Sequence, residues 1–258
     1  MTGGGQVMAF RALAYWLMRY RRTWQGTIVV SVANPILFLL AIGAGLGTLV
    51  QEPVEGASYL AFFAPGLLAA AALQNAFVEG GFVVNSALRR ERIYPTAAAT
   101  PLEPGEIFAG HLIFITLRLF ISAGAFVVAM ALFGLIESVA VGVVITLAAT
   151  LTGLAFATPL AAWAVTARDI SQINTVFRFV VMPLYLFSGT FFSIAQLPEP
   201  LETLARITPL WHGVDLCRTL ALGTASLGPS LVHAGYLAGL AIAGALIGRV
   251  TFRRSLHA

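Results

Sequence analysis

Few side chains that could carry enzyme chemistry lie at spacings that would assemble an active site. The chain has four histidines: His111, His212, His233 and His257. They are far apart, and none has a histidine or cysteine at ligand spacing, so no metal site is predicted. Ser188 and His233 could supply a nucleophile and its base. An intramembrane serine protease, however, needs a glycine two residues before the serine, and Leu186 stands there. We therefore expect no catalytic residue in this chain.

Nucleotide chemistry is also excluded from the chain itself. A phosphate-binding loop of the Gly-x-x-x-x-Gly-Lys-Ser/Thr type requires a lysine, and the sequence contains none. If the protein moves solutes at the expense of ATP, the ATP and its magnesium must be bound by another chain. No cofactor is expected here.

Two charged residues fall within apolar runs and need an explanation. Arg118 lies near the middle of the run "IFITLRLFISAG", and Glu79 lies near the end of an earlier run. An arginine at that depth costs a few kcal/mol, so it should face protein or water rather than lipid. Glu79 is a candidate partner. One interpretation makes Arg118 part of a structural ion pair or hydrogen-bond network, and the other places it on a substrate path.

The composition indicates which elements position these residues. The chain is 59% hydrophobic and only 10% charged, whereas soluble domains are about 25% charged. Apolar blocks of about 20 residues match the thickness of a bilayer, where the backbone must form helices. We predict an all-α, polytopic membrane protein forming a single transmembrane domain over 1–258. Its six spans are expected at 27–50, 59–84, 107–135, 139–165, 173–192 and 230–250.

Arginine placement predicts the orientation. Most arginines fall on one side of a six-span zigzag: Arg11, Arg19, Arg21, Arg22, Arg89, Arg90, Arg92, Arg168, Arg249, Arg253 and Arg254. By the positive-inside rule, both termini should be cytoplasmic in an inner or plasma membrane. In the loop on that side between the fourth and fifth spans, Asp169 is expected to cap the fifth helix, with a partner contact as the alternative.

An amphipathic helix is predicted before the first span, over 6–24. Phe10, Leu13 and Leu17 recur on one face, and Arg11, Arg19 and Arg22 gather on the other. Such a helix lies in the membrane interface. It can serve as a plain anchor, or its polar face can also contact a cytoplasmic partner.

The segment between the last two predicted spans, 193–229, is too long for a turn and yet rich in apolar residues. Pro and Gly breaks predict short re-entrant helices, which are tolerated where protein or a water-filled cavity surrounds them. The segment is either a packed outer lid or an exit gate. His212 and Asp215, three apart, suggest no more than a local hydrogen bond. The residues expected on a path or gate are Glu79, Arg118, Phe187, Phe191, Phe192 and His212.

The remaining feature is the charged loop at 88–105, within "LRRERIYPTAAATPLEPGEIFAGHL". Its order of residues resembles the loop after the second span of type 2 ABC exporter permeases. The matching positions are Arg90, Glu91, Arg92, Thr100, Pro101, Glu106 and Ile107. Pro95 departs from the pattern, because many relatives run a continuous short helix there, and it leaves the limits of that helix open.

A second stretch is similar to the branch of nodulation lipo-oligosaccharide export permeases. The matching residues are Ser188–Phe192, Leu197, Pro198, Pro209, Leu210, His212 and Arg218. The resemblance spans essentially the whole chain. It implies export of a lipid-linked saccharide, lipo-oligosaccharide or drug.

The resemblance also implies an assembly of two permease chains, identical or homologous, with two ATP-binding subunits. The loop would be a cytoplasmic coupling helix docked on the ATPase. The residues expected to make this contact are Arg89, Arg90, Glu91, Arg92, Thr100, Pro101 and Glu106.

Two other classes of protein remain as alternatives. An ion-coupled secondary transporter would need intramembrane carboxylates, and only Glu79 approaches such a position. No inverted repeat is visible in the sequence. A non-transporting membrane scaffold would not require the charged loop.

Overall fold

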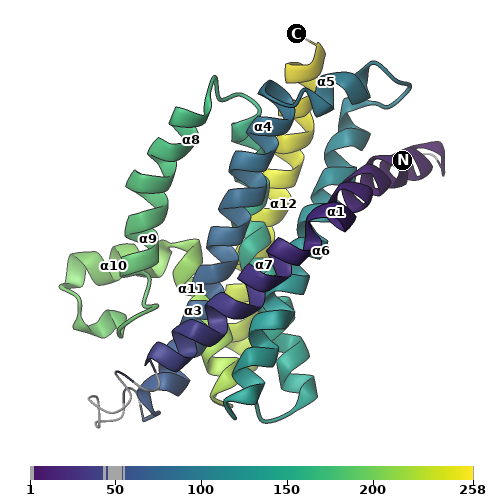
Figure 1. Cartoon of the computed structure of the whole chain (residues 1–258). Helices are drawn as coiled ribbons and strands as arrows, with labels where there is room; N and C mark the ends of the chain where they lie inside the picture. The colour runs from purple at the N-terminus through teal and green to yellow at the C-terminus, as the bar shows by residue number, and fades with distance from the viewer. Residues whose placement is uncertain (1–2, 43–44, 46–53, 55, 258) are drawn as a thin grey trace.

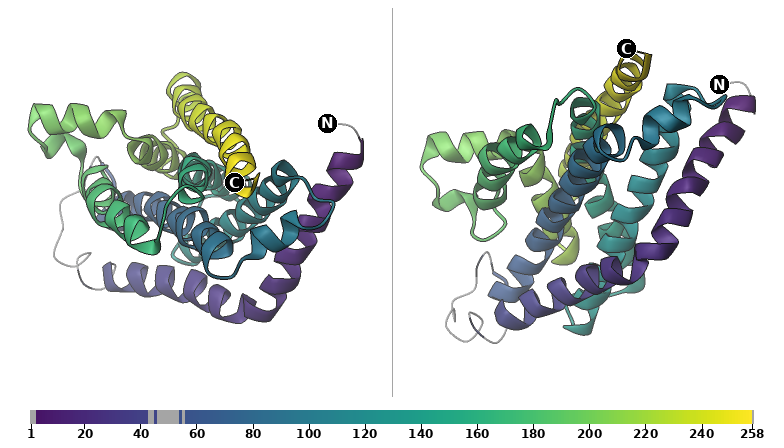
Figure 2. Two further views of the ribbon diagram at one scale, coloured as in Figure 1. Left: turned by 90° about the horizontal axis from the view of Figure 1, so that it is seen from above. Right: turned by 45° about the horizontal axis from the view of Figure 1, so that its top comes forward.

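The computed structural model describes residues 3–42, 45, 54 and 56–257 as a bundle of long helices (Figure 1). The first helix, α1, is continuous from Gly3 to Ala41. No break in helical structure therefore separates the predicted interface helix, 6–24, from the start of the predicted span at 27–50. Residues 43–44 and 46–50 of that span lie outside the described residues. Seen from above, α1 bends midway along its length (Figure 2).

Five helical stretches within the described residues are long and apolar enough to cross a membrane: Tyr59–Arg89, Pro104–Leu132, Val139–Ala164, Ile170–Phe187 and Leu227–Leu256. They correspond to the second to sixth predicted spans, with ends shifted by a few residues. The first predicted span has no counterpart in this set. The structure thus supports an all-helical membrane protein with five candidate spans.

The second predicted span is a composite helix. It comprises α3 (Tyr59–Phe77), a π-helical segment η2 (Val78–Val83) and α4 (Val84–Arg89). A short helix α5 (Ile93–Ala98) follows, and then α6 (Pro104–Leu132). The fifth predicted span is also composite, with α8 (Ile170–Val176), η3 (Phe177–Val181) and α9 (Met182–Phe187).

α7 (Val139–Ala164) is the central helix, contacted by α3, α6, α11 and α12. Small residues let its neighbours approach closely, as is usual between membrane helices. A β-carbon on Gly80 of η2, for example, would lie 2.6 Å from the Ala157 carbonyl oxygen of α7. The side chains of Ser138 and Asp169 cap the helices that follow them, α7 and α8. The capping role predicted for Asp169 is therefore present.

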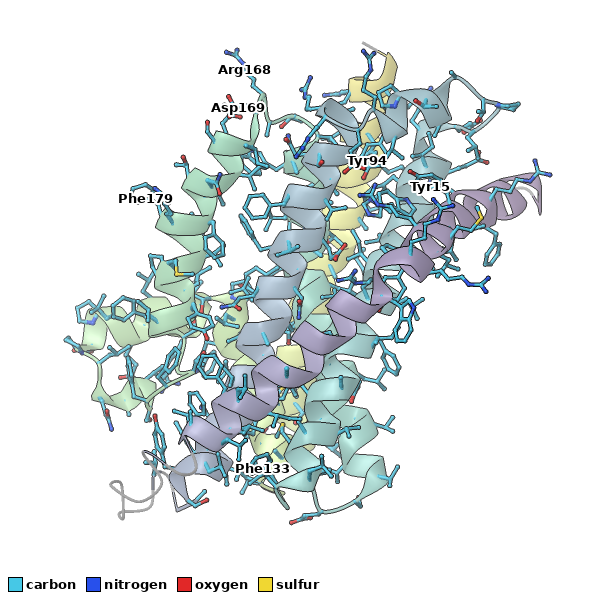
Figure 3. The ribbon with its side chains drawn as sticks, in the orientation of Figure 1. Tyr15, Tyr94, Phe133, Arg168, Asp169 and Phe179 are labelled. Atoms are coloured by element: carbon cyan, nitrogen blue, oxygen red, sulfur yellow. The ribbon has the colours of Figure 1, made fainter. Side chains whose placement is uncertain are left out.

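The segment between α9 and the last helix folds into a 3₁₀ turn η4 (Ile194–Gln196), α10 (Glu199–Ile207) and α11 (Pro209–Ala221). α11 packs inside the bundle against α3 and α7. The last helix is α12 (Leu227–His257). It ends beside α5, at the same end of the molecule as the loop that carries Arg168 and Asp169 (Figures 1 and 3).

Candidate functional site

The charged loop is a turn between two long helices, the composite helix that ends in α4 and α6. α4 ends at Arg89, and Arg92 adopts a left-handed conformation with φ of 54°, which redirects the chain into α5. Pro95 is the third residue of α5, in the first turn, where its missing N–H removes no helical hydrogen bond. The helix in this loop is therefore Ile93–Ala98, and Pro95 does not interrupt it. α5 lies at the extreme end of the bundle (Figure 1).

Most residues of this loop that were expected to dock a partner are exposed: Arg89, Arg90, Glu91, Arg92, Thr100 and Pro101. Glu106 differs, because its carboxylate accepts the Glu103 backbone N–H at 2.9 Å in a capping box at the start of α6. The Thr100 hydroxyl donates to the Ala97 carbonyl at 2.7 Å. These two residues set the shape of the turn, while the charged run projects outward.

α1 is tied to this loop by an ion pair between Arg19 and Glu91. Ser86 donates a further hydrogen bond to Glu91 at 3.0 Å. The hydrogen bond from Arg19 holds the pKa of Glu91 below its usual range. Of the three arginines predicted on the polar face of the interface helix, Arg11 and Arg22 are exposed and Arg19 pairs within the chain. The polar face of α1 thus contacts the predicted coupling loop.

A buried aromatic cluster lies beneath this ion pair. The rings of Trp16 and His111 stack with centroids 3.8 Å apart and planes 6° apart. The Tyr94 hydroxyl lies 2.5 Å from Nδ1 of His111, and the Tyr94 ring meets Phe252 at 5.1 Å. Burial raises the pKa of Tyr94 well above its usual value, so its hydroxyl keeps its proton next to the buried imidazole of His111. α1, α5, α6 and α12 are therefore joined at one place (Figure 3 labels Tyr94).

Deeper in the bundle, the structure brings Arg118 and Glu79 together. Arg118 Nη2 lies 2.9 Å from a Glu79 carboxylate oxygen, and the two side chains are 21% and 5% exposed. The pairing predicted from the sequence is therefore present. Glu79 belongs to η2, and π-helical segments inside longer helices are frequent at functional sites. The Arg118 guanidinium carbon also lies 5.1 Å from the centre of the Tyr20 ring, so α1 reaches this pair as well.

The three phenylalanines expected near the exit lie in different environments. Phe187, the last residue of α9, is 47% exposed. Phe191 is half-buried; its ring packs against Phe63 and Tyr185, and its carbonyl accepts the Tyr59 hydroxyl at 3.2 Å. Phe192 is also half-buried. Phe191 thus helps to hold the segment that follows α9 onto α3, whereas Phe187 faces outward.

His212 takes part in a cluster that the sequence did not indicate. Its Nδ1 lies 2.7 Å from Nδ1 of His233, and Nε2 of His233 lies 3.1 Å from an Asp215 carboxylate oxygen. His212 and Asp215 are thus joined through His233 rather than by a bond to one another. Ser188 lies elsewhere, 3.2 Å from the Thr208 hydroxyl. The cluster links α11 to α12.

Arg218 is the strongest contact that sequence analysis missed. It is only 6% exposed, although the sequence indicated no role for it beyond its match to the nodulation branch. Its guanidinium donates to the carbonyls of Phe62, at 3.0 Å, and Gly189, at 2.7 Å. The same group lies 3.7 Å from the centre of the Phe62 ring. Arg218 therefore fastens α11 to α3 and to the backbone that follows α9.

The comparisons with known proteins agree with this architecture. The family model described as "ABC-2 type transporter" matches residues 9–222. Nodulation protein J of Rhizobium meliloti (strain 1021) is 31% identical over 86% of this chain and 84% of its own length. Nodulation protein J of Bradyrhizobium diazoefficiens is 29% identical over 96% and 95%. The inner membrane transport permease YadH of Escherichia coli (strain K12) is 28% identical over 80% and 79%. This chain therefore belongs to the ABC-2 type transporter family.

Proposed function

We propose that this chain is the membrane-spanning permease of an ATP-driven exporter that moves an amphipathic substrate outward across the inner or plasma membrane. A separate subunit binds ATP and magnesium, and two such subunits act with two permease chains. Family membership supports the transport role. Both termini lie on the cytoplasmic side, with the charged loop 88–105.

The observation that carries this proposal is the construction of the charged loop. The exposed run Arg89–Arg92 and α5 stand at the end of the bundle, between the continuous helix Tyr59–Arg89 and the capped start of α6. A push on α5 therefore acts on two membrane helices at once, and through the Glu91–Arg19 ion pair it also acts on α1. A partner that changes conformation on binding ATP needs a mechanical connection of this kind, so that its closure favours one of two arrangements of the membrane helices.

A second permease chain is supported by the exposure of α8–α9. Only 11% of the residues in the apolar stretch Ile170–Phe187 are buried inside this chain, against 72% in the most apolar 18 residues of Tyr59–Arg89. Phe179, which is 76% exposed, points away from the bundle (Figure 3). Lipid can cover such a helix, but a continuous apolar surface also suits packing against another permease. The substrate path would then run between the two chains.

The substrate class proposed is a lipid-linked saccharide, a lipo-oligosaccharide or a drug. The saccharide-bearing choices rest on the resemblance to nodulation lipo-oligosaccharide export permeases, and the similarity to proteins named nodulation protein J is consistent with that branch. The outward-facing ring of Phe187 offers an apolar surface of the kind that an amphipathic substrate could contact. We place the largely buried Glu79–Arg118 ion pair beside the substrate path between the two permease chains.

Co-purification tests the proposal. Tagged wild-type protein and an Arg90→Glu, Arg92→Glu variant are purified in mild detergent, and the chains recovered are identified by mass spectrometry and assayed for ATP hydrolysis. We expect an ATP-binding subunit with the wild type and little with the variant. An Arg21→Glu, Arg206→Glu variant changes the same charge at exposed positions outside the loop and should keep the subunit.

Two results would contradict parts of this proposal. Absence of any ATP-binding subunit, from wild-type protein that remains monodisperse, would exclude the ABC exporter assignment. Equal recovery with the Arg90→Glu, Arg92→Glu variant would keep the assignment and move the docking contact away from the charged run.

A further inference from the structure

Two cavities border the turn that connects α5 to α6, one on each side. The first, here called the apolar cavity, has a volume of about 420 Å³ and lies between α1 and α5. The second, here called the basic cavity, has a volume of about 580 Å³ and lies between the turn and the end of α12. Thr100 and Leu102 line both cavities. The turn is therefore a ridge between two hollows.

The apolar cavity has a hydrophobic floor and a polar rim. Trp16, Tyr94 and Ile107 are almost fully buried and form part of its lining, while Tyr15 and Glu91 at its edge are exposed. The ion pair of Glu91 with Arg19 bridges α1 and the loop beside this hollow. Deep apolar pockets of this size hold bulky hydrophobic side chains at protein interfaces.

The basic cavity carries two arginines on one face of α12. Arg249 and Arg253 are four residues apart, are exposed, and have no carboxylate within 4.0 Å among the described residues. Like charges at this spacing destabilise a helix slightly, and an incoming carboxylate would relieve that repulsion. Glu103 also lines the cavity, but its carboxylate is engaged in the capping box of α6.

Both cavities are at the end of the molecule where α5 and the C-terminal end of α12 lie side by side (Figures 1 and 2). This is also the end at which the charged run Arg89–Arg92 projects. A soluble partner approaching the loop from this direction would meet both hollows and the ridge together.

We infer that the ATP-binding subunit straddles the Thr100–Leu102 ridge, placing a bulky apolar side chain in the apolar cavity and a carboxylate in the basic cavity. This inference rests on the proposed function and extends it. Docking is then not limited to the charged run 89–92, and the end of α12 becomes part of the contact. The chemistry of the partner is also specified: its docking segment pairs a hydrophobic residue with an acidic one.

Each cavity has a variant and a matched control. Ala97→Trp places bulk in the apolar cavity, and Ala131→Trp adds the same bulk at an exposed residue near the other end of α6 that lines neither cavity. Arg249→Glu with Arg253→Glu reverses the charge of the basic cavity, and Arg21→Glu with Arg206→Glu is the charge-matched control. The chains are reconstituted in nanodiscs, and the affinity is measured for the ATP-binding subunit that co-purifies with the wild type.

We expect each cavity variant to bind at least about 10-fold more weakly, because close interfacial charge pairs and buried anchors contribute more than about 1.4 kcal/mol. The controls should bind like the wild type. The loss caused by the arginine reversals should shrink at high salt, whereas the loss caused by Ala97→Trp should not.

Unchanged affinity in both cavity variants would overturn the inference while leaving the exporter assignment intact, since the wild type would still bind the subunit. Failure of the wild type to bind any ATP-binding subunit would instead contradict the proposed function. If the reversals weakened binding to vesicles with anionic lipid but not to the subunit, the basic cavity would be a lipid site and the inference would be wrong. Arg253→Gln, a milder surface change, provides the same test should the double reversal fold poorly.

Discussion

Removing the charge of Arg118 is expected to destabilise the protein far more than removing the whole ion pair. Breaking a buried pair by deleting one partner typically costs 3–5 kcal/mol, because the other charge is left uncompensated. The side chain of Arg118 is 21% exposed, and that of Glu79 only 5%, so water can screen the pair in part. We expect Arg118→Gln to lower the free energy of unfolding by about 2–3 kcal/mol.

The cost of protonating Glu79 sets an upper limit on this loss of stability, and that limit is a similar number. A stranded carboxylate can always be neutralised by a proton, and for an ordinary glutamic acid at pH 7 this costs about 3–4 kcal/mol. The double variant Glu79→Gln, Arg118→Gln leaves two amides that can bond to each other. It should lose about 1 kcal/mol or less, the scale measured for hydrogen bonds between membrane helices.

Cys217 provides the assay. It is the only cysteine of the chain and is buried, so a thiol-reactive fluorophore should label it only on unfolding. For a chain of this size, 2–3 kcal/mol corresponds to a fall in Tm of roughly 5–10 °C. The double variant should melt within about 3 °C of the wild type. The reasoning fails if Arg118→Gln melts like the wild type. It also fails if the losses of Tm of Glu79→Gln and Arg118→Gln simply add in the double variant, because the two side chains would then not be energetically coupled.

Three further predictions concern contacts described above. Arg218→Lys cannot bond both carbonyls with the same geometry and should cost about 1–3 kcal/mol, measured by thermal unfolding followed by circular dichroism. Glu91→Gln should cost less than about 1 kcal/mol at pH 7, because both partners are over one-third exposed. Arg19 lowers the pKa of Glu91 in the folded protein, so the stabilisation by this pair is complete above the pKa of an ordinary glutamate, about 4.3. It disappears as the pH falls through the lowered pKa. The difference in Tm between the wild type and Glu91→Gln should therefore vanish below that lowered pKa. Gly80→Ala should push η2 away from α7 and lower both Tm and transport, whereas Gly124→Ala, where the added carbon meets only an ordinary contact at 3.8 Å, should leave both unchanged or raise the Tm slightly.

The features that followed from the sequence are those set by local physics. A charge in a hydrocarbon run must find a partner, so Glu79 could be named as a candidate for Arg118, and the structure pairs them. An aspartate before a helical pattern caps that helix, and Asp169 does so. Runs of about 20 apolar residues located five helices within a few residues of their ends. The helix ends and the cap depend on the length and polarity of one segment, whereas the choice of Glu79 also required that two helices lie side by side.

The features that did not follow depend on contacts between distant segments. Arg218 looked like a loop charge, because nothing near it in the sequence reveals the carbonyls of Phe62 and Gly189 that it binds. His233 looked isolated until α11 and α12 were placed side by side. The unbroken helix through 3–41 was hidden as well, since a change from amphipathic to apolar pattern reads as a boundary even where the backbone continues.

Two ion pairs border α1: Arg19–Glu91, which includes a residue of α1, and Arg118–Glu79, which α1 contacts through Tyr20. Their relative strengths indicate which would break first when the loop moves. Arg19 and Tyr20 are consecutive, so they point about 100° apart on the helix, one toward Glu91 of the loop and the other toward Arg118 of α6. A displacement of the loop must therefore carry α1 with it or break the exposed pair. That pair contributes less than about 1 kcal/mol, whereas separating Arg118 from Glu79 costs several times more. The exposed pair would therefore break before the deeper one, while the ring contact between Trp16 and Tyr94 still joins α1 to the loop. A shift of η2 against α6 then requires the larger energy that nucleotide-driven closure of a partner would supply.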